Sequence, residues 1–256
     1  MVSPLKQRSA MLFLVLGGFF IANAIIAEFI GVKIFSLEQT FGYQPFNWHL
    51  LGINGSLQFT AGVLLWPIVF TMSDIINEYF GHRGVRILSV LAAALIGYAF
   101  LMVYVAIQLA PADWWIASNV VNGVPNMQAA FAGVFGQGLW IIGGSLVAFF
   151  IGQFADVFIF HEVKKRTGER FLWLRAVGST LVSQLVDSYV VLYIAFVLGP
   201  QHWSIGQFLA IGTVNYCYKF VAAFALTPLL YLVHEGVERY LGHELAAKMK
   251  ADAAEQ

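Results

Sequence analysis

Charged residues and cysteines are scarce in this chain. Of its 256 residues, only 11% are Asp, Glu, Lys or Arg, while 59% are hydrophobic. A soluble globular domain averages roughly 25% charged residues, so this composition excludes a large soluble core and indicates an integral membrane protein. The single cysteine, Cys217, excludes an intrachain disulfide and any metal site built from several cysteines.

The chain also lacks the motifs of common enzyme classes. None of its six histidines forms a His-x-x-His or His-Glu-x-x-His pattern. No Gly-x-Ser-x-Gly nucleophile motif or phosphate-binding loop occurs, and no basic arm or recognition helix suggests nucleic acid. A channel would need a repeated filter or a ring of like charges, and the sequence contains neither. We therefore expect no enzyme activity, metal, cofactor or nucleic-acid partner.

Long apolar runs are abundant instead. A helix needs about 20 apolar residues to cross a hydrocarbon core about 30 Å thick. Six spans are predicted, at about 10–35, 56–80, 85–110, 129–160, 176–199 and 207–234. No linker divides the chain, so we expect residues 1–256 to form one all-α, polytopic bundle of six transmembrane helices. The fourth run is longer than a bilayer requires, and its first part, 128–138, is expected outside or along the surface.

Basic residues define the expected orientation. They precede the first span, separate the second from the third and the fourth from the fifth, and follow the sixth, as Lys6, Arg8, Arg83, Arg86, Lys164, Lys165, Arg166, Arg170, Arg175, Arg239, Lys248 and Lys250. The connections at 37–55, 111–127 and 199–206 have none. The positive-inside rule then predicts that both termini are cytoplasmic. The last residues, 244–251, are expected to form a short exposed helical tail.

Polar residues inside the apolar runs are the most informative feature. Two runs carry the same pattern, Gln153-x-x-Asp156 and Gln184-x-x-Asp187. Positions i and i+3 share a helix face, so each Gln points the same way as its Asp. A charge at membrane depth costs several kcal/mol on insertion scales, and such residues usually face a cavity or a partner. These helix faces are therefore expected to line a binding site.

Other runs contribute polar residues at related depths. The predicted site comprises Asn23, Asp74, Asn77, Gln153, Asp156, Gln184, Asp187 and Lys219, with Glu28, Glu78, Ser183 and Asn215 as secondary candidates. With a helical rise of about 1.5 Å per residue, Asp187 and Lys219 both come out about 20 Å from the inner face. We predict that they form an ion pair, in a site near the bilayer midplane, where transporters bind substrates.

Each residue also has a purely structural interpretation. The amides could only hydrogen-bond between helices, and the predicted ion pair could be structural. Asp74 and Glu78 could be solvated helix-end acids, and Glu28 could extend its carboxylate to the surface. Prolines inside two spans, Pro67 and Pro228, are expected to kink their helices. The contribution of polar groups by four or five helices favours a binding site.

The chemistry of this set suits a planar, hydrogen-bonding solute. A carboxylate can accept two parallel N–H bonds, and a primary amide offers both a donor and an acceptor. Aromatic side chains can cover the faces of a ring. Phe149, Phe154, Tyr189 and Tyr216 lie within reach by sequence.

The same residues carry a resemblance to a known family. The segments are 67–81, with Asp74, Asn77 and Glu78; Gln153-x-x-Asp156; 179–188, with Ser183, Gln184 and Asp187; Tyr218-Lys219; and Thr227-Pro228-x-x-Tyr231. Together they resemble the signature of the queuosine precursor transporter family, formerly called putative vitamin uptake transporters. The resemblance runs from the first span to Tyr231. One departure is Arg175-Ala176-Val177-Gly178, where the family pattern leads us to expect an Asn.

The resemblance implies a six-helix protein of the bacterial inner membrane that imports 7-deazaguanines for tRNA modification. On that basis, Asp187 or Asp74 would accept N1–H and the exocyclic amine of the base. Gln153 and Gln184 would bind O6 and the pyrrole-ring side, and Lys219 would keep Asp187 ionised. A cationic aminomethyl group would pair with Asp156 or Glu28.

Several alternatives stay open at this point. The chain could be a substrate-capture subunit for a purine-like or vitamin-like heterocycle, energised by a separate module. The ligand could be the cyano form, the aminomethyl form or queuine. Either proton coupling or facilitated diffusion is compatible with the sequence, and glycine-rich helix faces would allow a homodimer.

Overall fold

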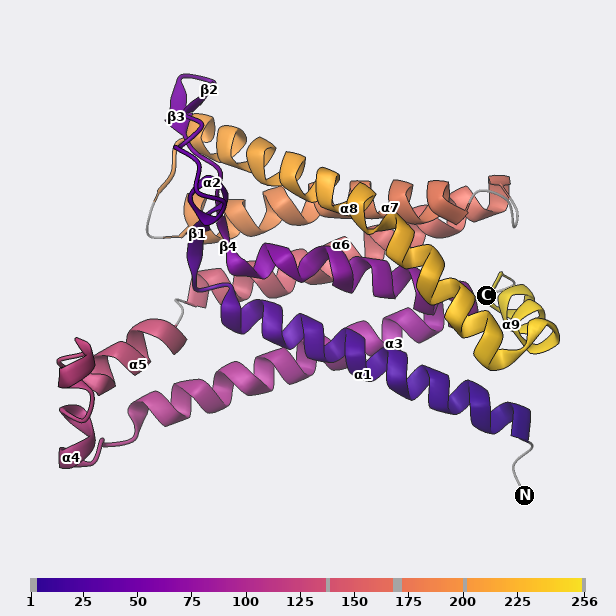
Figure 1. Ribbon diagram of the computed structural model, residues 1–256, viewed down its shortest axis with the longest axis horizontal. Helices are drawn as coiled ribbons and strands as arrows, with labels where there is room; N and C mark the ends of the chain where they lie inside the picture. Colours follow the sequence, from indigo (N-terminus) through magenta and orange to yellow (C-terminus); the bar gives the residue numbers. More distant parts are fainter. Residues whose placement is uncertain (1–3, 137–138, 168–171, 200–201, 255–256) are drawn as a thin grey trace.

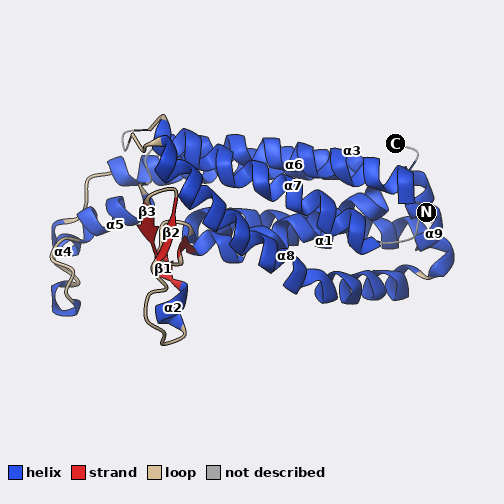
Figure 2. Ribbon diagram, turned by 90° about the horizontal axis from the view of Figure 1, so that it is seen from above, coloured by secondary structure: helices blue, strands red, loops and turns tan. Residues whose placement is uncertain are grey.

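The computed structural model describes residues 4–136, 139–167, 172–199 and 202–254, and long helices lying side by side dominate it (Figures 1 and 2). The elements, in chain order, are α1 (Pro4–Ile30), β1 (Ile34–Ser36), α2 (Leu37–Thr40), β2 (Trp48–Leu50), β3 (Ile53–Gly55), β4 (Gln58–Thr60), η1 (Ala61–Leu64), α3 (Trp66–Gln108), α4 (Asp113–Ile116), η2 (Val120–Asn122), α5 (Met127–Phe135), α6 (Leu139–Thr167), α7 (Leu172–Leu192), η3 (Tyr193–Val197), α8 (Ile205–Leu241) and α9 (His243–Ala254).

The architecture confirms an all-α membrane protein. Among the described residues, four helical stretches are long and apolar enough to cross a membrane, at 7–30, 61–108, 143–167 and 205–241. A shorter apolar helix covers 181–197. The strands and α2, α4 and α5 lie at one end of the molecule, while the start of α1 and all of α9 lie at the other (Figures 1 and 2).

Helix α3 contains both the second and the third predicted spans. Its regular helix is interrupted at Gly81, where φ is 67° and ψ is −176°. This conformation is essentially restricted to glycine. The chain runs in opposite directions along the two arms of α3, first from β4 toward the end that carries α9 and then back to α4 (Figure 1). The break at Gly81 falls within the gap left between these two predicted spans, 81–84, and one glycine makes the reversal.

The second span also begins later than predicted. Residues 58–60 form β4 and 61–64 form a 3-10 helix, so α3 starts at Trp66. Pro67 lies in the first turn of α3, where its missing N–H has no helical partner to lose. The expectation that Pro67 kinks a helix interior was therefore wrong. Pro228 does lie inside α8, whose later part is inclined to its beginning (Figure 1), as a proline bend produces.

The first part of the fourth predicted span forms a helix of its own. Residues 127–135 form the separate helix α5 beside α4, and α6 starts at Leu139. Helix α6 packs most extensively against α7. Helix α7 continues into η3, a π-helical turn, a widened geometry often found at functional sites. Arg170, in the basic connection between α6 and α7, lies outside the described residues.

The C-terminal tail is helical but not exposed. In α9, Ala246, Met249 and Ala253 are buried, and the helix packs against α3 and α8. The Lys250 ammonium contacts the Glu238 carboxylate of α8 at 2.8 Å. The prediction of an exposed tail was wrong because small and apolar residues three to four positions apart give this helix a face that packs.

Candidate functional site

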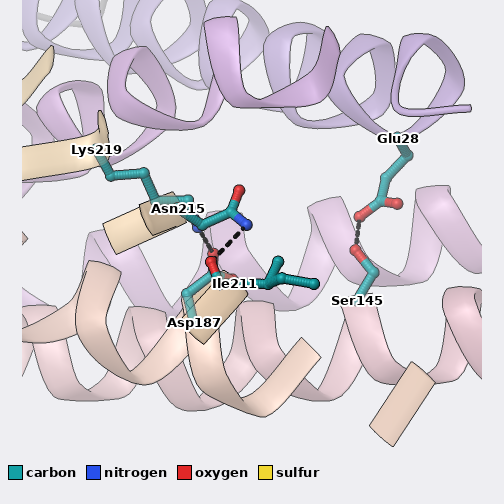
Figure 3. Close-up of polar contacts among 6 residues, drawn as sticks. All are labelled: Glu28, Ser145, Asp187, Ile211, Asn215 and Lys219. Atoms are coloured by element: carbon teal, nitrogen blue, oxygen red, sulfur yellow. Dashed lines mark hydrogen bonds and ion pairs between the residues drawn. The ribbon is translucent and has the colours of Figure 1, made fainter. Parts of the chain in front are cut away.

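The predicted ion pair is present between α7 and α8. The Lys219 Nζ atom donates to Oδ2 of Asp187 at 2.5 Å, and their side chains are 5% and 8% exposed. Figure 3 shows the two side chains reaching toward each other across the helix interface. Burying either charge alone would be costly, and pairing offsets much of that cost. This confirms the prediction from helix depth.

One helical turn before Asp187, the Gln184 amide is fully buried. Within the described part of the chain, neither its Nε2 nor its Oε1 has a hydrogen-bond partner, and the buried Ser188 hydroxyl has none either. An unsatisfied buried polar group costs about 1–3 kcal/mol, so unpaired groups in a native interior call for an explanation. We name Asp187, Lys219, Gln184 and Ser188 the ion-pair cluster.

A second set of polar residues joins α3, α6 and α7. Ser73 donates to Asp156 Oδ2 at 2.8 Å, and Ser183 donates to Asp156 Oδ1 at 3.3 Å. Ser179 donates to Asp74 Oδ1 at 3.1 Å. The two acids also interact directly with each other. We name these five residues the acid–serine cluster.

Every member of the acid–serine cluster is buried. Two carboxyl groups in contact disfavour double ionisation, so they can share one proton. Burial rules out the alternative that Asp74 is a solvated helix-end acid, and it does the same for Glu78. Ser73 and Ser179 were absent from the predicted set. The four-residue spacing between Ser179 and Ser183, which puts both hydroxyls on one helix face, was the available signal.

The second glutamine of the pattern faces a different neighbour. Gln153 accepts a long hydrogen bond from Ser89, on the second arm of α3, at 3.4 Å. Its Nε2 atom has no partner among the described residues. The side chain lines a mostly apolar cavity between α3 and α6, formed by His82, Val85, Arg86, Ser89, Phe150, Gln153, Phe154 and Val157.

Two histidines complete the end of the site nearest the termini. Asn77 Oδ1 lies 3.0 Å from His161 Nε2, while the Asn77 Nδ2 atom is without a partner in the described ranges. The Tyr79 hydroxyl lies 2.9 Å from His234 Nδ1. Sequence reasoning treated these histidines only as residues at span ends. Their positions near the ends of α6 and α8 gave no signal that they would meet α3.

Glu28 of α1 points inward. It is 6% exposed and accepts a hydrogen bond from Ser145 of α6, and it is close enough to Asp187 to interact electrostatically. Figure 3 shows Glu28 turned toward Ser145 in the same part of the interior as Asp187 and Lys219. The alternative that Glu28 extends to the surface was therefore wrong.

Two of the predicted amides bond to their own helices. Asn23 Nδ2 donates to the Phe19 carbonyl at 2.8 Å, and Asn215 Nδ2 donates to the Ile211 carbonyl at 3.0 Å. Asn215 lies beside Lys219 in Figure 3. Both residues therefore satisfy their donors locally, and their carbonyl oxygens are the groups that could face a solute.

The four aromatic residues within reach by sequence behave differently from one another. Phe149 is buried, Tyr189 places its hydroxyl 2.9 Å from that of Thr213, and Tyr216 contacts Phe220. Phe154 is 54% exposed, and it lines the same cavity as Gln153.

The described residues include no group of three or more His, Cys, Asp or Glu side chains arranged to hold a metal ion. The interior instead combines one ion pair, an acid pair, hydroxyls and amides. Such groups can bind and orient a polar solute through hydrogen bonds, and their donors and acceptors come from α1, α3, α6, α7 and α8.

Comparisons with known proteins agree with the motifs. Residues 60–233 match the family model described as Putative vitamin uptake transporter. A relative from Bacillus subtilis (strain 168), named "Probable queuosine precursor transporter", is 28% identical over 173 residues, covering 67% of this chain and 70% of the relative. A relative from Escherichia coli (strain K12), named "Queuosine precursor transporter", is 26% identical over 204 residues, covering 73% of this chain and 84% of the relative.

No solved structure matches the chain significantly. The family model covers most of the helical core, from β4 through α8, and includes both the ion-pair cluster and the acid–serine cluster. The chain belongs to the Putative vitamin uptake transporter family.

Proposed function

We propose that this chain imports 7-deazaguanine precursors of queuosine across the bacterial inner membrane. The printed names of the two relatives support this substrate class. The unpaired groups of the ion-pair cluster support it chemically, because a guanine-like edge presents both donors and acceptors to such groups. The cyano and aminomethyl forms, and queuine, share that edge.

The proposed topology has six crossings with both termini in the cytoplasm. Helix α1, the two arms of α3, α6, α7 with η3, and α8 would each cross once. The opposite directions of the two α3 arms and the placement of α1's start and α9 at one end support it (Figure 1). Arg83 and Arg86 lie just after the reversal at Gly81, on the same side as Lys248 and Lys250, as the positive-inside rule requires.

We assign the recognition of the base to the ion-pair cluster. Asp187 would accept N1–H and the exocyclic amine, while Lys219, held on Oδ2, would keep the carboxylate ionised. Gln184 would donate to O6, and its carbonyl or the Ser188 hydroxyl would meet a ring N–H. Asp74 is a weaker candidate because Ser179 and Asp156 already engage its carboxyl group.

The remaining predicted residues have secondary roles in this proposal. Glu28 is the acid we assign to a cationic aminomethyl substituent, because it lies within electrostatic reach of Asp187. Asp156 is bonded by serines and is less suited to that role. Gln153, Asn77 and Asn23 would line the path on either side of the cluster.

The observation that carries the proposal is the Gln184 amide, which is fully buried with both of its polar atoms unpaired among the described residues. A bound heterocycle would satisfy both atoms at once. A purely structural glutamine would instead hydrogen-bond to a neighbouring helix, as buried polar groups normally do.

The test uses bacteria that neither synthesise nor import deazaguanines. Cells expressing the chain would receive nanomolar cyano- or aminomethyl-deazaguanine, and queuosine would be measured in their tRNA. We expect restoration by the wild type and loss with Asp187→Asn and with Gln184→Met, at equal membrane abundance. No restoration by an abundant wild-type protein would refute the substrate class.

A second assay separates a carrier from a substrate-capture subunit. The purified chain would be reconstituted alone in liposomes and supplied with labelled deazaguanine, with and without an imposed pH gradient. Uptake into the lumen by the chain alone supports a self-sufficient carrier, and a response to the gradient indicates proton coupling. Binding without uptake would support the capture subunit.

A further inference from the structure

The segment formed by β4 and η1 lies between α1 and α8. From β4, the Phe59 ring is 3% exposed and lies 4.6 Å from the Tyr218 ring of α8, centre to centre. Tyr218 immediately precedes Lys219, a member of the ion-pair cluster. The strand therefore reaches α8 at the level of the proposed binding site.

The other end of this segment rests on α1. A Cβ atom added to Gly62 of η1 would lie 2.7 Å from the Ala27 carbonyl oxygen, nearer than real Cβ atoms approach backbone. Only glycine allows this close backbone contact. Ala27 immediately precedes Glu28, the inward-facing acid of α1. Residues 59–62 thus connect the two helices that carry Glu28 and Lys219.

The segment is held by a small number of contacts on its outer side. Strand β4 pairs with β1 over three residue pairs, with Phe35 opposite Phe59. The Ala61 amide donates to the Lys33 carbonyl at 2.8 Å. A two-stranded sheet this short has little stability of its own, so its closed position depends on packing against α1 and α8.

We propose that β4 and η1 form the outer gate of the transport path, with the contact between Phe59 and Tyr218 as its closing contact. The proposal rests on the function proposed above, because it assumes that solute reaches the ion-pair cluster from the end of the molecule that carries the strands. A solute entering between α1 and α8 would have to separate Phe59 from Tyr218. The structure is then a state closed on this side.

The chain can bend at both ends of the gate. Gly55 precedes β4, and η1 is followed at Leu65 by the start of α3. Below this point, α3 is buried among α1, α6 and α7. Ser56 and Leu57 are held by hydrogen bonds to Trp48 and Glu38, so movement of residues 58–64 leaves both that anchor and the first arm of α3 in place, as a gating loop requires. When the Phe59 side chain moves away, the Tyr218 ring remains as an aromatic surface against which the heterocycle would pack.

The test reads access to the interior and does not need the natural solute. In a Cys217→Ser background, Asn215→Cys places a single thiol beside Lys219. Its rate of reaction with a small, membrane-impermeant thiol reagent is measured from the outer side, in cells or oriented vesicles. We expect Phe59→Ala to raise this rate about tenfold, since it removes an aromatic contact of the expected strength.

Phe35→Ala is the matched control. This variant removes the Phe35 ring, which lies opposite Phe59 in the same sheet. We expect it to change the reaction rate less than about twofold, because cross-strand contacts contribute little to the contact between Phe59 and Tyr218. Gly62→Ala, which would displace η1 from Ala27, is expected to raise the rate as Phe59→Ala does. Equal rates in all three variants and the parent would overturn the gate.

A cross-link gives a second, independent result. In the Cys217→Ser background, Phe59→Cys and Tyr218→Cys would be joined by a short bis-methanethiosulfonate reagent, which forms two reducible disulfides. Outer access to the interior would be measured as quenching of a fluorophore attached at position 215 through a non-natural amino acid by chemistry that does not involve thiols. We expect the cross-link to reduce quenching from outside and a reducing agent to restore it. Unchanged quenching would refute the gate. If access behaves as expected but deazaguanine uptake is absent, the gate stands and the substrate assignment fails.

Discussion

The ion-pair cluster and the acid–serine cluster are equally buried but differ in how completely they are hydrogen-bonded. In the acid–serine cluster, three serine hydroxyls donate to Asp74 and Asp156. In the ion-pair cluster, the charges are paired, while Gln184 and Ser188 lack partners in the part of the chain that the structure describes. Buried polar groups that are hydrogen-bonded within the protein indicate a structural role, whereas buried polar groups without partners indicate a place for a ligand. Substitutions of the bonded serines should therefore mainly affect stability, and substitutions of the unpaired groups should mainly affect transport.

The largest effect is expected from removing one member of the ion pair. Lys219→Met leaves Asp187 buried without its partner, which should cost about 3–5 kcal/mol of unfolding free energy and abolish uptake. The measurements are thermal stability in detergent and deazaguanine uptake. The double variant Asp187→Asn with Lys219→Met should recover stability but not uptake. Recovery of uptake as well would show that the pair is only structural.

Gln184→Met should affect transport alone. It removes an amide with no partner among the described residues, so the unfolding free energy should stay within about 1 kcal/mol of the wild type or rise. Loss of two hydrogen bonds to the solute should lower uptake about 10- to 100-fold. Reduced stability with unchanged affinity would instead assign Gln184 to the structure.

Ser183→Ala is the matched change in the acid–serine cluster. It stands next to Gln184 but donates to Asp156, and its loss should cost about 1–2 kcal/mol of unfolding free energy. Uptake per folded molecule should change little. Combining it with Ser73→Ala, which removes a second donor to Asp156, should give a non-additive loss because both donors share one carboxylate.

The smallest effect concerns Glu38, a buried acid of α2 at the end of the molecule that carries the strands. Burial opposes its ionisation, but hydrogen bonds from the backbone N–H groups of Leu57 and Phe46 and from the Ser36 hydroxyl outweigh this and lower its pKa to about 2. Because the folded pKa lies below the ordinary value of 4.5, its stabilising contribution is present above about pH 4.5 and is lost as the pH falls toward 2.

Hydrogen exchange in residues 41–57 would measure this contribution. Protection should be constant between pH 7 and pH 5, after correction for intrinsic rates, and should fall below pH 4.5. Glu38→Gln should show the reduced protection already at pH 7. If both proteins lost protection in parallel below pH 4.5, another group would be responsible.

The all-α membrane fold and the ion pair were predictable from the sequence because both depend on local rules. Apolar length indicates spans, and a uniform helical rise places Asp187 and Lys219 at one depth. The identity of the helices that meet depends on tertiary packing. Sequence spacing therefore could not show that Asn77 meets His161, or that Ser145 donates to Glu28.

The errors also have physical causes. A hydropathy window averages over about 19 residues, so it cannot separate the three residues of β4 from the apolar helix that follows. Phe59 was therefore assigned to a span, although it pairs with Phe35 in a sheet. Burial of α9 was missed because alanines supply much of its packing face, and a face of small residues has a weak hydropathy signal. The sequence suggested that Gln153 and Gln184 are equivalent, but their surroundings differ because the helices that flank them differ.

The position of α9 has a consequence for biogenesis. This helix follows α8 in the chain, and it packs on α3, which is made much earlier. During translation, α3 enters the membrane while residues 243–254 are still unmade or inside the ribosome. The end of the bundle that carries α9 can therefore be completed only after residues 243–254 have left the ribosome, so a chain truncated before His243 would show the incompletely assembled protein.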